Sequence, residues 1–415
     1  MRSAFAAAAV AAAAYLPSLA GVFQFDDYNV IVNDPTVHSW GALLAGAGSG
    51  IRPLLKASYI FNWLYGGFAL FNIACHAMNT VLLFLIGERL FGNRRAALIA
   101  ALLFALHPAA TEAVTYISGR SSSMMAVLYL GAMLAYLRSA YWSSAALFVL
   151  AVATRETAVT LPPALLLCEL CRGAWPGWRE VLRRQWAHWT LLLAGAAFVL
   201  LNPRYFDLVA YGYGVRSLGD NLLTQVGGVS YLILRLVSLH GYNIDPALPT
   251  LTEWTPLLAF QAFSLSLLLA VGIMNLKARP WVAFGVLWFF LQLAPTNSIV
   301  PRLDVANDRQ LYLACWGLFL ALCIQLRNLP GFAFAIILLV FTGASILRQL
   351  DYRSEIALWE SSVALAPWNA RGHNNLGYAY QMAGRTQDAR REYLEALILD
   401  PAHAKARLNL HFLDD

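Results

Sequence analysis

Charged residues are scarce in this chain. Only 13% of its 415 residues are Asp, Glu, Lys or Arg, whereas 59% are hydrophobic. A soluble domain usually carries charge on about a quarter of its residues, so this composition argues against a soluble protein and favours a polytopic membrane protein. The net charge is +6, but no basic patch with interleaved aromatic residues occurs, so we expect no nucleic-acid partner.

Cysteine is scarce as well. All five cysteines lie in or at the ends of apolar segments, which argues against the disulfide framework of a small secreted domain. Cys168 and Cys171 have the spacing of a redox or metal-binding pair, but no second pair or histidine cluster accompanies them. We interpret the two as small apolar residues at a helix end.

Long apolar stretches make up most of the chain. A transmembrane helix needs about 20 apolar residues, and the sequence predicts an all-α polytopic membrane bundle of about eleven spans. The first resembles a signal peptide, but its apolar run is long and an acidic pair follows at once, so we expect it to stay uncleaved. The predicted spans lie near residues 4–22, 71–87, 96–107, 122–137, 143–154, 157–171, 187–202, 256–276, 281–297, 310–326 and 331–347.

The placement of basic residues predicts the orientation. Bases cluster in the even-numbered connections, which the positive-inside rule assigns to the cytoplasm. The odd-numbered connections, and everything after residue 348, are then extracytoplasmic. This pattern requires residues 221–240, which are apolar enough to span, to form a helix at the outer surface. Residues 54–65 are expected to form a second surface helix. The predicted cytoplasmic bases are Arg2, Arg89, Arg94, Arg95, Arg138, Arg172, Arg179, Arg183, Arg184, Lys277, Arg279 and Arg327.

Other basic residues fall on the predicted outer side, where the rule disfavours them. Some can be solvated loop charges. Others would suit a membrane enzyme that acts on an anionic lipid headgroup, because a guanidinium binds phosphate through two hydrogen bonds. These residues are Arg52, Lys56, Arg120, Arg155, Arg204, Arg216, Arg302 and Arg309.

Residues 370–403 have the pattern of a tetratricopeptide repeat, a helix-turn-helix unit of about 34 residues. Fragments of further units precede and follow it. Because such repeats need about three units to stand alone, we expect this one to lean on the membrane domain or on a partner. We divide the chain into a membrane domain, 1–348, and an extracytoplasmic repeat domain, 349–415. The residues that carry the repeat pattern are Leu376, Gly377, Tyr380, Ala389, Tyr393, Ala396 and Pro401.

The acidic pair Asp26 and Asp27, directly after the first apolar stretch, is the best catalytic candidate. A carboxylate at the membrane surface can take the proton from a hydroxyl that attacks an activated sugar. The pair could instead form a solvated turn or a helix cap. With Asp34 close by, it could also hold a divalent cation such as Mg²⁺ or Mn²⁺, which prefers oxygen ligands.

Further polar residues lie within or beside the predicted spans. His76 shares a helical face with Asn72 and Asn79, and hydrogen bonding between helices is the favoured interpretation of this set. The adjacent Arg155 and Glu156 form either a self-satisfied pair or a substrate clamp, and the sequence does not decide between them.

Taken in order, these motifs resemble the transmembrane and tetratricopeptide-repeat-containing O-mannosyltransferases, which belong to the type C glycosyltransferases. The resemblance covers nearly the whole chain, and the order of the motifs is more specific than any one of them. The motifs are Phe25-Asp26-Asp27-Tyr28, Arg52-Pro53-Leu54, Asn72 with His76 and Asn79, His107-Pro108 with Thr111-Glu112, Gly119-Arg120, Arg155-Glu156, and Asp308-Arg309 with Tyr312, followed by the repeat.

The resemblance implies a type C fold and a reaction. Members of the class transfer a sugar, here possibly mannose, from a polyprenyl-phosphate donor on the extracytoplasmic side. An acid of the first outer loop acts as the base, which implies Asp26 with Asp27 as its helper. The acceptor would be a protein or peptide, and the short repeat region suggests a bacterial inner-membrane protein. The implied donor-phosphate residues are Arg309, Arg155, Arg120 and Arg52, and the implied substrate residues are His76, His107, Glu112, Glu156 and Tyr312.

Two other functions are compatible with a polytopic chain. A transporter of lipid-linked sugars would also have many spans, but the sequence shows no inverted repeat. A non-catalytic scaffold that recruits partners through the repeat would not need the acidic pair.

Overall fold

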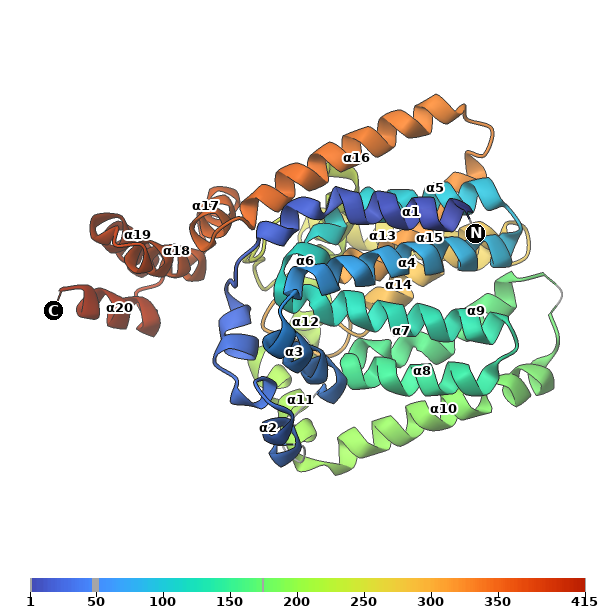
Figure 1. The fold of residues 1–415 in the computed structure, drawn as a ribbon, viewed down its shortest axis with the longest axis horizontal. Coiled ribbons are helices and arrows are strands. Elements are labelled where there is room, and N and C mark those ends of the chain that lie inside the picture. The colour runs from blue at the N-terminus through green and yellow to red at the C-terminus, as the bar shows by residue number, and fades with distance from the viewer. Residues whose placement is uncertain (1, 47–51, 174, 415) are drawn as a thin grey trace.

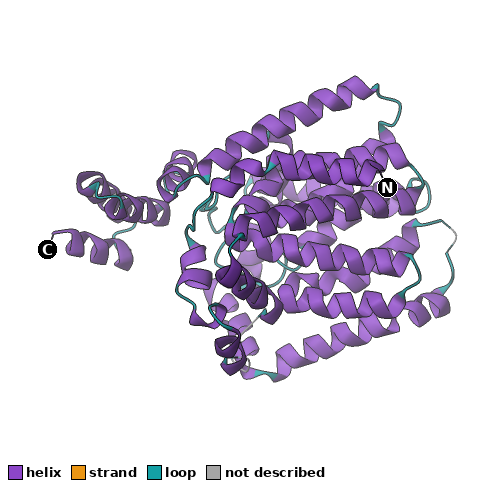
Figure 2. Ribbon diagram, in the orientation of Figure 1, coloured by secondary structure: helices purple, strands orange, loops and turns teal. Residues whose placement is uncertain are grey.

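The protein is helical throughout the part that the structure describes, and this part contains no strand (Figure 2). The structure is a computed structural model that describes residues 2–46, 52–173 and 175–414. Within α11 (Pro203–Val215), the side chain of Arg204 lies outside the described ones. The all-α fold predicted from the sequence is therefore confirmed.

The long apolar helices lie side by side and form a bundle (Figure 1). Each of the eleven predicted spans overlaps one of them, because a continuous apolar stretch in a chain with few charges favours a buried or membrane helix. The bundle helices are α1 (Arg2–Ala14), α4 (Phe68–Phe91), α5 (Arg94–Leu106), α7 (Arg120–Leu137), α8 (Tyr141–Thr154), α9 (Leu161–Cys171), α10 (Trp178–Leu201), α13 (Pro256–Met274), α14 (Pro280–Leu293), α15 (Leu311–Gln325) and α16 (Gly331–Asp351).

Only some of these helices have the length of a complete span. Among the described residues, α4, α13 and α16 are long and apolar enough to cross a membrane alone. Helix α5 and the segment Pro108–Thr115, bent by 59°, could form a fourth span. The first span is shorter than predicted: α1 ends at Ala14, and a 3₁₀ turn with Pro17 follows because proline interrupts the helical hydrogen bonding. The count of eleven spans stays a prediction.

Connections that carry most of the bases meet at one end of the bundle. Arg89 donates to the carbonyl of Leu137 at 2.8 Å, and Arg95 donates to the carbonyl of Leu329 at 2.7 Å. Arg94 reaches Ser3 near the start of α1. The alternation of connections that the charge pattern predicts is thus present in the geometry, with the acidic pair at the other end.

Helix α12 (Leu218–Ser238) covers most of residues 221–240, the segment that the charge pattern places at the outer surface and not across the membrane. Its Val229 and Leu232 pack with Phe289 and Leu293 at the end of α14. Asn221 donates to the carbonyl of Ser298, just beyond α14, at 2.7 Å. The helix therefore rests on the bundle end that holds the acidic pair, which suits the predicted surface location.

Short helices cover the same end. Helix α3 (Pro53–Tyr65) coincides with the second predicted surface helix and exposes Phe61, Trp63 and Tyr65. The remaining short elements are η1 (Leu16–Ala20), η2 (Tyr28–Val32), η3 (Pro35–Val37), α2 (Trp40–Ala45), η4 (Pro108–Ala110), α6 (Thr111–Thr115), η5 (Ile117–Gly119), η6 (Glu156–Thr160) and η7 (Asp308–Gln310).

The C-terminal helices form the repeat and project from that end of the bundle (Figure 1). Close helix packing is visible at Gly377, where a Cβ atom would lie 2.7 Å from the ring of Tyr393. The ring of Trp359 packs edge-on against Phe25 of the membrane domain at 5.0 Å. The prediction that the repeat leans on the membrane domain is confirmed. Its helices are α17 (Glu355–Leu365), α18 (Ala370–Met382), α19 (Thr386–Leu399) and α20 (Ala404–Asp414).

Candidate active site

The two adjacent aspartates have different surroundings. The carboxylate of Asp27 is 1% exposed and accepts hydrogen bonds from the backbone N–H of Gln24 at 3.0 Å and of Ser118 at 2.8 Å. The backbone N–H of Asp26 donates to the hydroxyl of Tyr116 at 2.8 Å, whereas its carboxylate lines a cavity. Asp27 therefore fixes the turn, and Asp26 is the acid that a substrate can reach.

The cavity beside Asp26 has a volume of about 130 Å³. Burial raises the pKa of Asp26 above its ordinary value, and the nearby charge of Arg309 offsets part of that rise. A carboxylate with a raised pKa is a better proton acceptor than a solvated one. The cavity is lined by Asp26, Val30, Arg52, Leu55, Tyr59, Ser118, Ser121, Arg155, Arg302 and Arg309.

Four arginines converge on this cavity, and two of them, Arg155 and Arg302, form no ion pair with a carboxylate of the described residues. Nε of Arg155 is buried without a hydrogen-bond partner among the described residues. Its pKa is lowered to about 9 by burial and by the positive charges of Arg52 and Arg309. No hydrogen bond or ion pair joins the Arg302 side chain to another described residue. Buried guanidinium donors that lack partners indicate room for an anion.

The other two arginines are held by glutamates. Arg309 lies with its Nε 3.5 Å from Oε1 of the buried Glu112, and its backbone N–H donates to Oε2 at 3.0 Å. Arg52 binds Glu156 through two hydrogen bonds of 2.6 and 2.9 Å at the rim. Glu156 therefore pairs with Arg52 and not with the adjacent Arg155, and Arg155 lines the cavity.

Gly119 fixes the backbone near Glu112. A Cβ atom at this glycine would lie 2.2 Å from the carbonyl oxygen of Glu112, so no other residue fits without a shift of the chain. The close approach lets α6 fold back against the start of α7 and places Glu112 opposite Arg309. The Gly119-Arg120 motif thus supports the site through packing.

A smaller cavity of about 30 Å³ adjoins the first and shares Arg155 and Arg309 with it. Tyr312 lines this cavity together with Gln292 and Thr296 from the end of α14. The two arginines therefore stand between Asp26 on one side and the helices α14 and α15 on the other.

Arg120, predicted to bind phosphate, does not line either cavity. Its buried guanidinium donates to Asn72 at 2.8 Å, to the carbonyl of Phe68 at 2.9 Å and to the carbonyl of Ser58 at 3.1 Å. It also lies over the rings of Tyr59, Phe68 and Phe71. These contacts use its donors to join α3, α4 and α7, so the geometry favours a structural role for Arg120.

The two histidines also join helices. His76 binds the hydroxyl of Tyr312 at 2.8 Å and the carbonyl of Ala105 at 3.0 Å. His107 accepts from the backbone N–H of Ala109 at 3.2 Å and contacts the carbonyl of Leu236 at 3.1 Å. Neither histidine lines either of the two cavities described above, so the geometry favours the interhelix hydrogen bonding that the sequence suggested for His76.

A cation site at the acidic pair finds no support in this geometry. Both carboxylate oxygens of Asp27 accept backbone hydrogen bonds, and the carboxylate of Asp34 binds Lys56 and Thr36. Within the described ranges, no three His, Cys, Asp or Glu side chains gather as metal ligands would.

Comparisons with known proteins show which family the chain resembles. The chain is 24% identical to protein O-mannosyl-transferase F38B6.6 of Caenorhabditis elegans over 94% of its own length. It is 25% identical to protein O-mannosyl-transferase TMTC3 of Mus musculus over 97% of its length. The chain resembles the transmembrane and tetratricopeptide-repeat-containing O-mannosyltransferases. A tetratricopeptide repeat model matches residues 370–403, where the sequence pattern predicts the repeat.

The similarity covers only part of these relatives. The chain spans 61% of the Caenorhabditis protein and 51% of the mouse protein. Protein O-mannosyl-transferase Tmtc1 of Drosophila melanogaster is 36% identical, over 41% of this chain and 23% of its own. No solved structure matches the chain significantly.

Proposed function

We propose that the protein is a membrane glycosyltransferase. It moves a sugar, mannose by analogy with the names of its relatives, from a polyprenyl-phosphate donor to an acceptor hydroxyl on a protein. The observation that carries this proposal is one cavity that contains both a carboxylate, Asp26, and four arginines. A base and an anion-binding group on one cavity are the two elements that displacement of a phosphate leaving group requires.

In the proposed reaction, Asp26 accepts the proton of the acceptor hydroxyl. The hydroxyl oxygen then forms a bond to the anomeric carbon while the bond from that carbon to the phosphate oxygen breaks. The electron pair of the broken bond leaves on the lipid phosphate, whose added negative charge is stabilised by Arg155, Arg302 and Arg309. A single displacement of this kind inverts the anomeric carbon.

The charges around the cavity suit an anionic donor. The four guanidinium groups that line it outnumber its one lining carboxylate, Asp26. A sugar joined to a polyprenyl chain through one phosphate is a diester with one negative charge, which these arginines can bind.

We assign supporting roles to the other residues of the acidic end. Asp27 positions Asp26 through its two backbone hydrogen bonds, and Glu112 positions Arg309. Tyr312 lines the smaller cavity while its hydroxyl is held by His76 and Asn79, so we assign it a positioning role beside Arg309. We exclude Arg120 from this site because its donors are used between helices.

We infer that the active site and the repeat lie outside the cytoplasm, in a bacterial inner membrane. The supporting observation is that the predicted cytoplasmic bases, such as Arg89, Arg94 and Arg95, gather at the bundle end away from Asp26. The lipid tail of the donor would then enter from the membrane and the acceptor from the side of the repeat.

A transfer assay tests the proposal. Purified protein is supplied with radiolabelled polyprenyl-phosphate mannose and an acceptor peptide, and Asp26→Asn is compared with Asp220→Asn, a half-buried aspartate that accepts a hydrogen bond from Ser217 and lines neither cavity. Loss of the positioned base should lower turnover by roughly 100-fold or more, and Asp220→Asn should match the wild type. A folded wild-type protein that transfers nothing from any polyprenyl-phosphate sugar would contradict the function. Near-normal turnover of Asp26→Asn would contradict only the role of this residue.

A further inference from the structure

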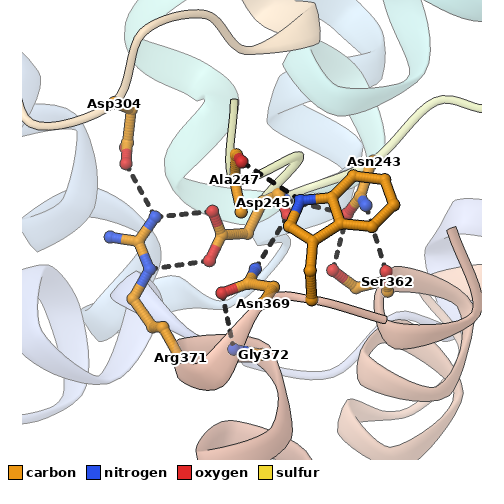
Figure 3. A network of polar contacts seen from close by, with 9 residues as sticks. Asn243, Asp245, Ala247, Asp304, Ser362, Asn369, Arg371 and Gly372 are labelled. Carbon is orange, nitrogen blue, oxygen red and sulfur yellow. Dashed lines mark hydrogen bonds and ion pairs between the residues drawn. The ribbon is translucent and has the colours of Figure 1, made fainter. Parts of the chain in front are cut away.

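The repeat is joined to the membrane domain by a dense polar contact (Figure 3). Arg371 of α18 binds both carboxylate oxygens of Asp245, at 2.5 and 2.6 Å, and reaches Asp304 at 2.7 Å. Asn369 donates to the carbonyl of Asp245 at 3.0 Å. Two loops of the membrane domain are thus held by one arginine of the repeat.

A second contact lies beside the first. The hydroxyl of Ser362 donates to Oδ1 of Asn243 at 2.5 Å, and Nδ2 of Asn243 donates back to the carbonyl of Ser362 at 3.1 Å (Figure 3). The backbone N–H of Asn243 points the other way and donates to Oδ2 of Asp308 at 2.9 Å. We call Ser362, Arg371, Asn243, Asp245 and Asp304 the clasp.

The clasp is linked to Arg309, one of the arginines that line the cavity, through Asp308. Asp308 directly precedes Arg309 and is 1% exposed, and its second oxygen has no hydrogen-bond partner among the described residues. Because so few hydrogen-bond donors reach this buried carboxylate, its position and stability depend strongly on each hydrogen bond that it accepts. The N–H of Asn243 therefore helps to fix the backbone at Arg309, and the repeat fixes the loop that carries Asn243.

We propose that the repeat is a positioning element of the active site: Ser362 and Arg371 hold the loop of Asn243 and Asp245, and this loop holds Asp308 so that Arg309 faces the cavity. The proposal builds on the proposed function, because it gives Arg309 the donor phosphate to bind. In this arrangement, displacement of the repeat by a partner or an acceptor would change the donor site.

The charges of the clasp also act on the candidate base. Burial raises the pKa of Asp26, the charges of Asp304 and Asp245 raise it further, and those of Arg309 and Arg371 lower it. Removal of one clasp charge should therefore shift this pKa in a direction set by the sign of that charge. The other charged groups around Asp26 are Asp27, Arg52, Arg155 and Arg302.

Hydrogen–deuterium exchange on the full-length protein in detergent tests the positioning without reference to activity. Arg371→Gln removes the clasp arginine, and Arg391→Gln removes an exposed arginine of the same repeat that pairs with Asp388 and Glu392. Arg371→Gln should speed exchange in residues 304–312, which include the N–H of Arg309 that Glu112 accepts. Arg391→Gln should not. Equal exchange of this segment in both variants would overturn the proposal.

Kinetics then test the consequence for the donor. Ser362→Ala deletes one buried hydrogen bond of the clasp and should raise the donor KM about five-fold, the scale of one such bond, with kcat little changed. Arg371→Gln should also move the acidic limb of the pH profile to higher pH, whereas Asp304→Asn should move it to lower pH. Arg371→Lys, which keeps the charge and loses the two-bond geometry, should raise the donor KM without moving the limb.

The outcomes separate the two proposals. An unchanged donor KM in Ser362→Ala and Arg371→Lys, with lower thermal stability, would make the clasp a purely structural joint and would overturn the positioning role. A wild-type protein without transfer activity would remove the proposed function. The exchange experiment would still decide whether the repeat holds the segment of Arg309.

Discussion

Replacing Arg302 should weaken donor binding and spare the fold, whereas replacing Arg120 should weaken the fold. Both arginines lie on the predicted outer side, and the family resemblance implies phosphate binding for Arg120 but not for Arg302. The structure separates them, because Arg120 is bonded to three neighbours between helices and Arg302 lines the cavity with no hydrogen bond or ion pair to another described residue. We therefore compare Arg302→Gln with Arg120→Gln.

The expected loss of affinity follows from the contact that Arg302 would make. A hydrogen bond to a charged group contributes about 1.5–3 kcal/mol, and about 1.4 kcal/mol corresponds to a factor of ten in an equilibrium constant. Arg302→Gln should thus weaken donor binding roughly 10- to 150-fold. Its thermal stability should stay the same or rise slightly, because the variant relieves repulsion among the four arginines.

The expected loss of stability for Arg120→Gln is larger. The variant leaves the Asn72 amide oxygen buried without its donor, takes a second hydrogen bond from the helix carbonyls of Ser58 and Phe68, and removes a cation from three aromatic rings. An unsatisfied buried group costs about 1–3 kcal/mol and a hydrogen bond to a charged group contributes about 1.5–3 kcal/mol, so a total of at least about 3 kcal/mol is expected. A surviving folded fraction should bind the donor as the wild type does.

Two measurements on the same preparations test the predicted loss of donor affinity and the predicted loss of stability. Equilibrium binding of a radiolabelled polyprenyl-phosphate sugar gives the affinity, and thermal unfolding in detergent gives the stability. Lys405→Gln, an exposed change in the last helix, serves as the control. If Arg302→Gln lowers the unfolding temperature as much as Arg120→Gln, or keeps full donor affinity, the division into ligand-binding and structural arginines is wrong.

Two further predictions concern pH and topology. Because burial raises the pKa of Asp26 and a base acts in its ionised form, kcat/KM should fall as the pH is lowered through that raised pKa; a pH-independent profile on the acidic side would rule Asp26 out as the base. A cysteine placed at the exposed Gln387 should react with an impermeant maleimide on intact cells, while the wild-type cysteines, four of them buried, should stay largely unlabelled. Labelling only after lysis would place the repeat in the cytoplasm and make residues 221–240 a span.

The helices could be predicted because their signal is local. An apolar stretch of sufficient length is visible in the sequence wherever it lies, and every predicted span coincides with a helix. The predicted ends of the spans were less accurate than their positions, because hydropathy does not mark where a helix begins or ends. Helix α10 begins at Trp178, nine residues before the predicted span at 187, because polar residues such as Arg183 and Arg184 continue a helix that hydropathy ends.

Part of the site was predictable from topology. Asp26 and Arg52 occur in the first outer connection, and Arg155 and Arg309 occur in two others; alternating spans bring these three connections to one end of the bundle. Arg120 shows the limit of this reasoning. Whether an arginine at a span end faces a cavity or the carbonyls of neighbouring helices depends on its rotamer and packing, which no local pattern encodes.

The clasp had no signal in the sequence at all. Asp245 and Asp304 lie in connections without hydrophobic periodicity, and Arg371 follows them by more than sixty residues and is not one of the residues that carry the repeat pattern. The sequence predicted only that the repeat packs against something else, because a single repeat unit with fragments on each side cannot bury its own core. In the structure the repeat packs against the membrane domain: Trp359 contacts Phe25, and Arg371 binds Asp245 and Asp304. Because those aspartates flank the segments of Asn243 and Arg309, the same contact that stabilises a short repeat also reaches the donor site.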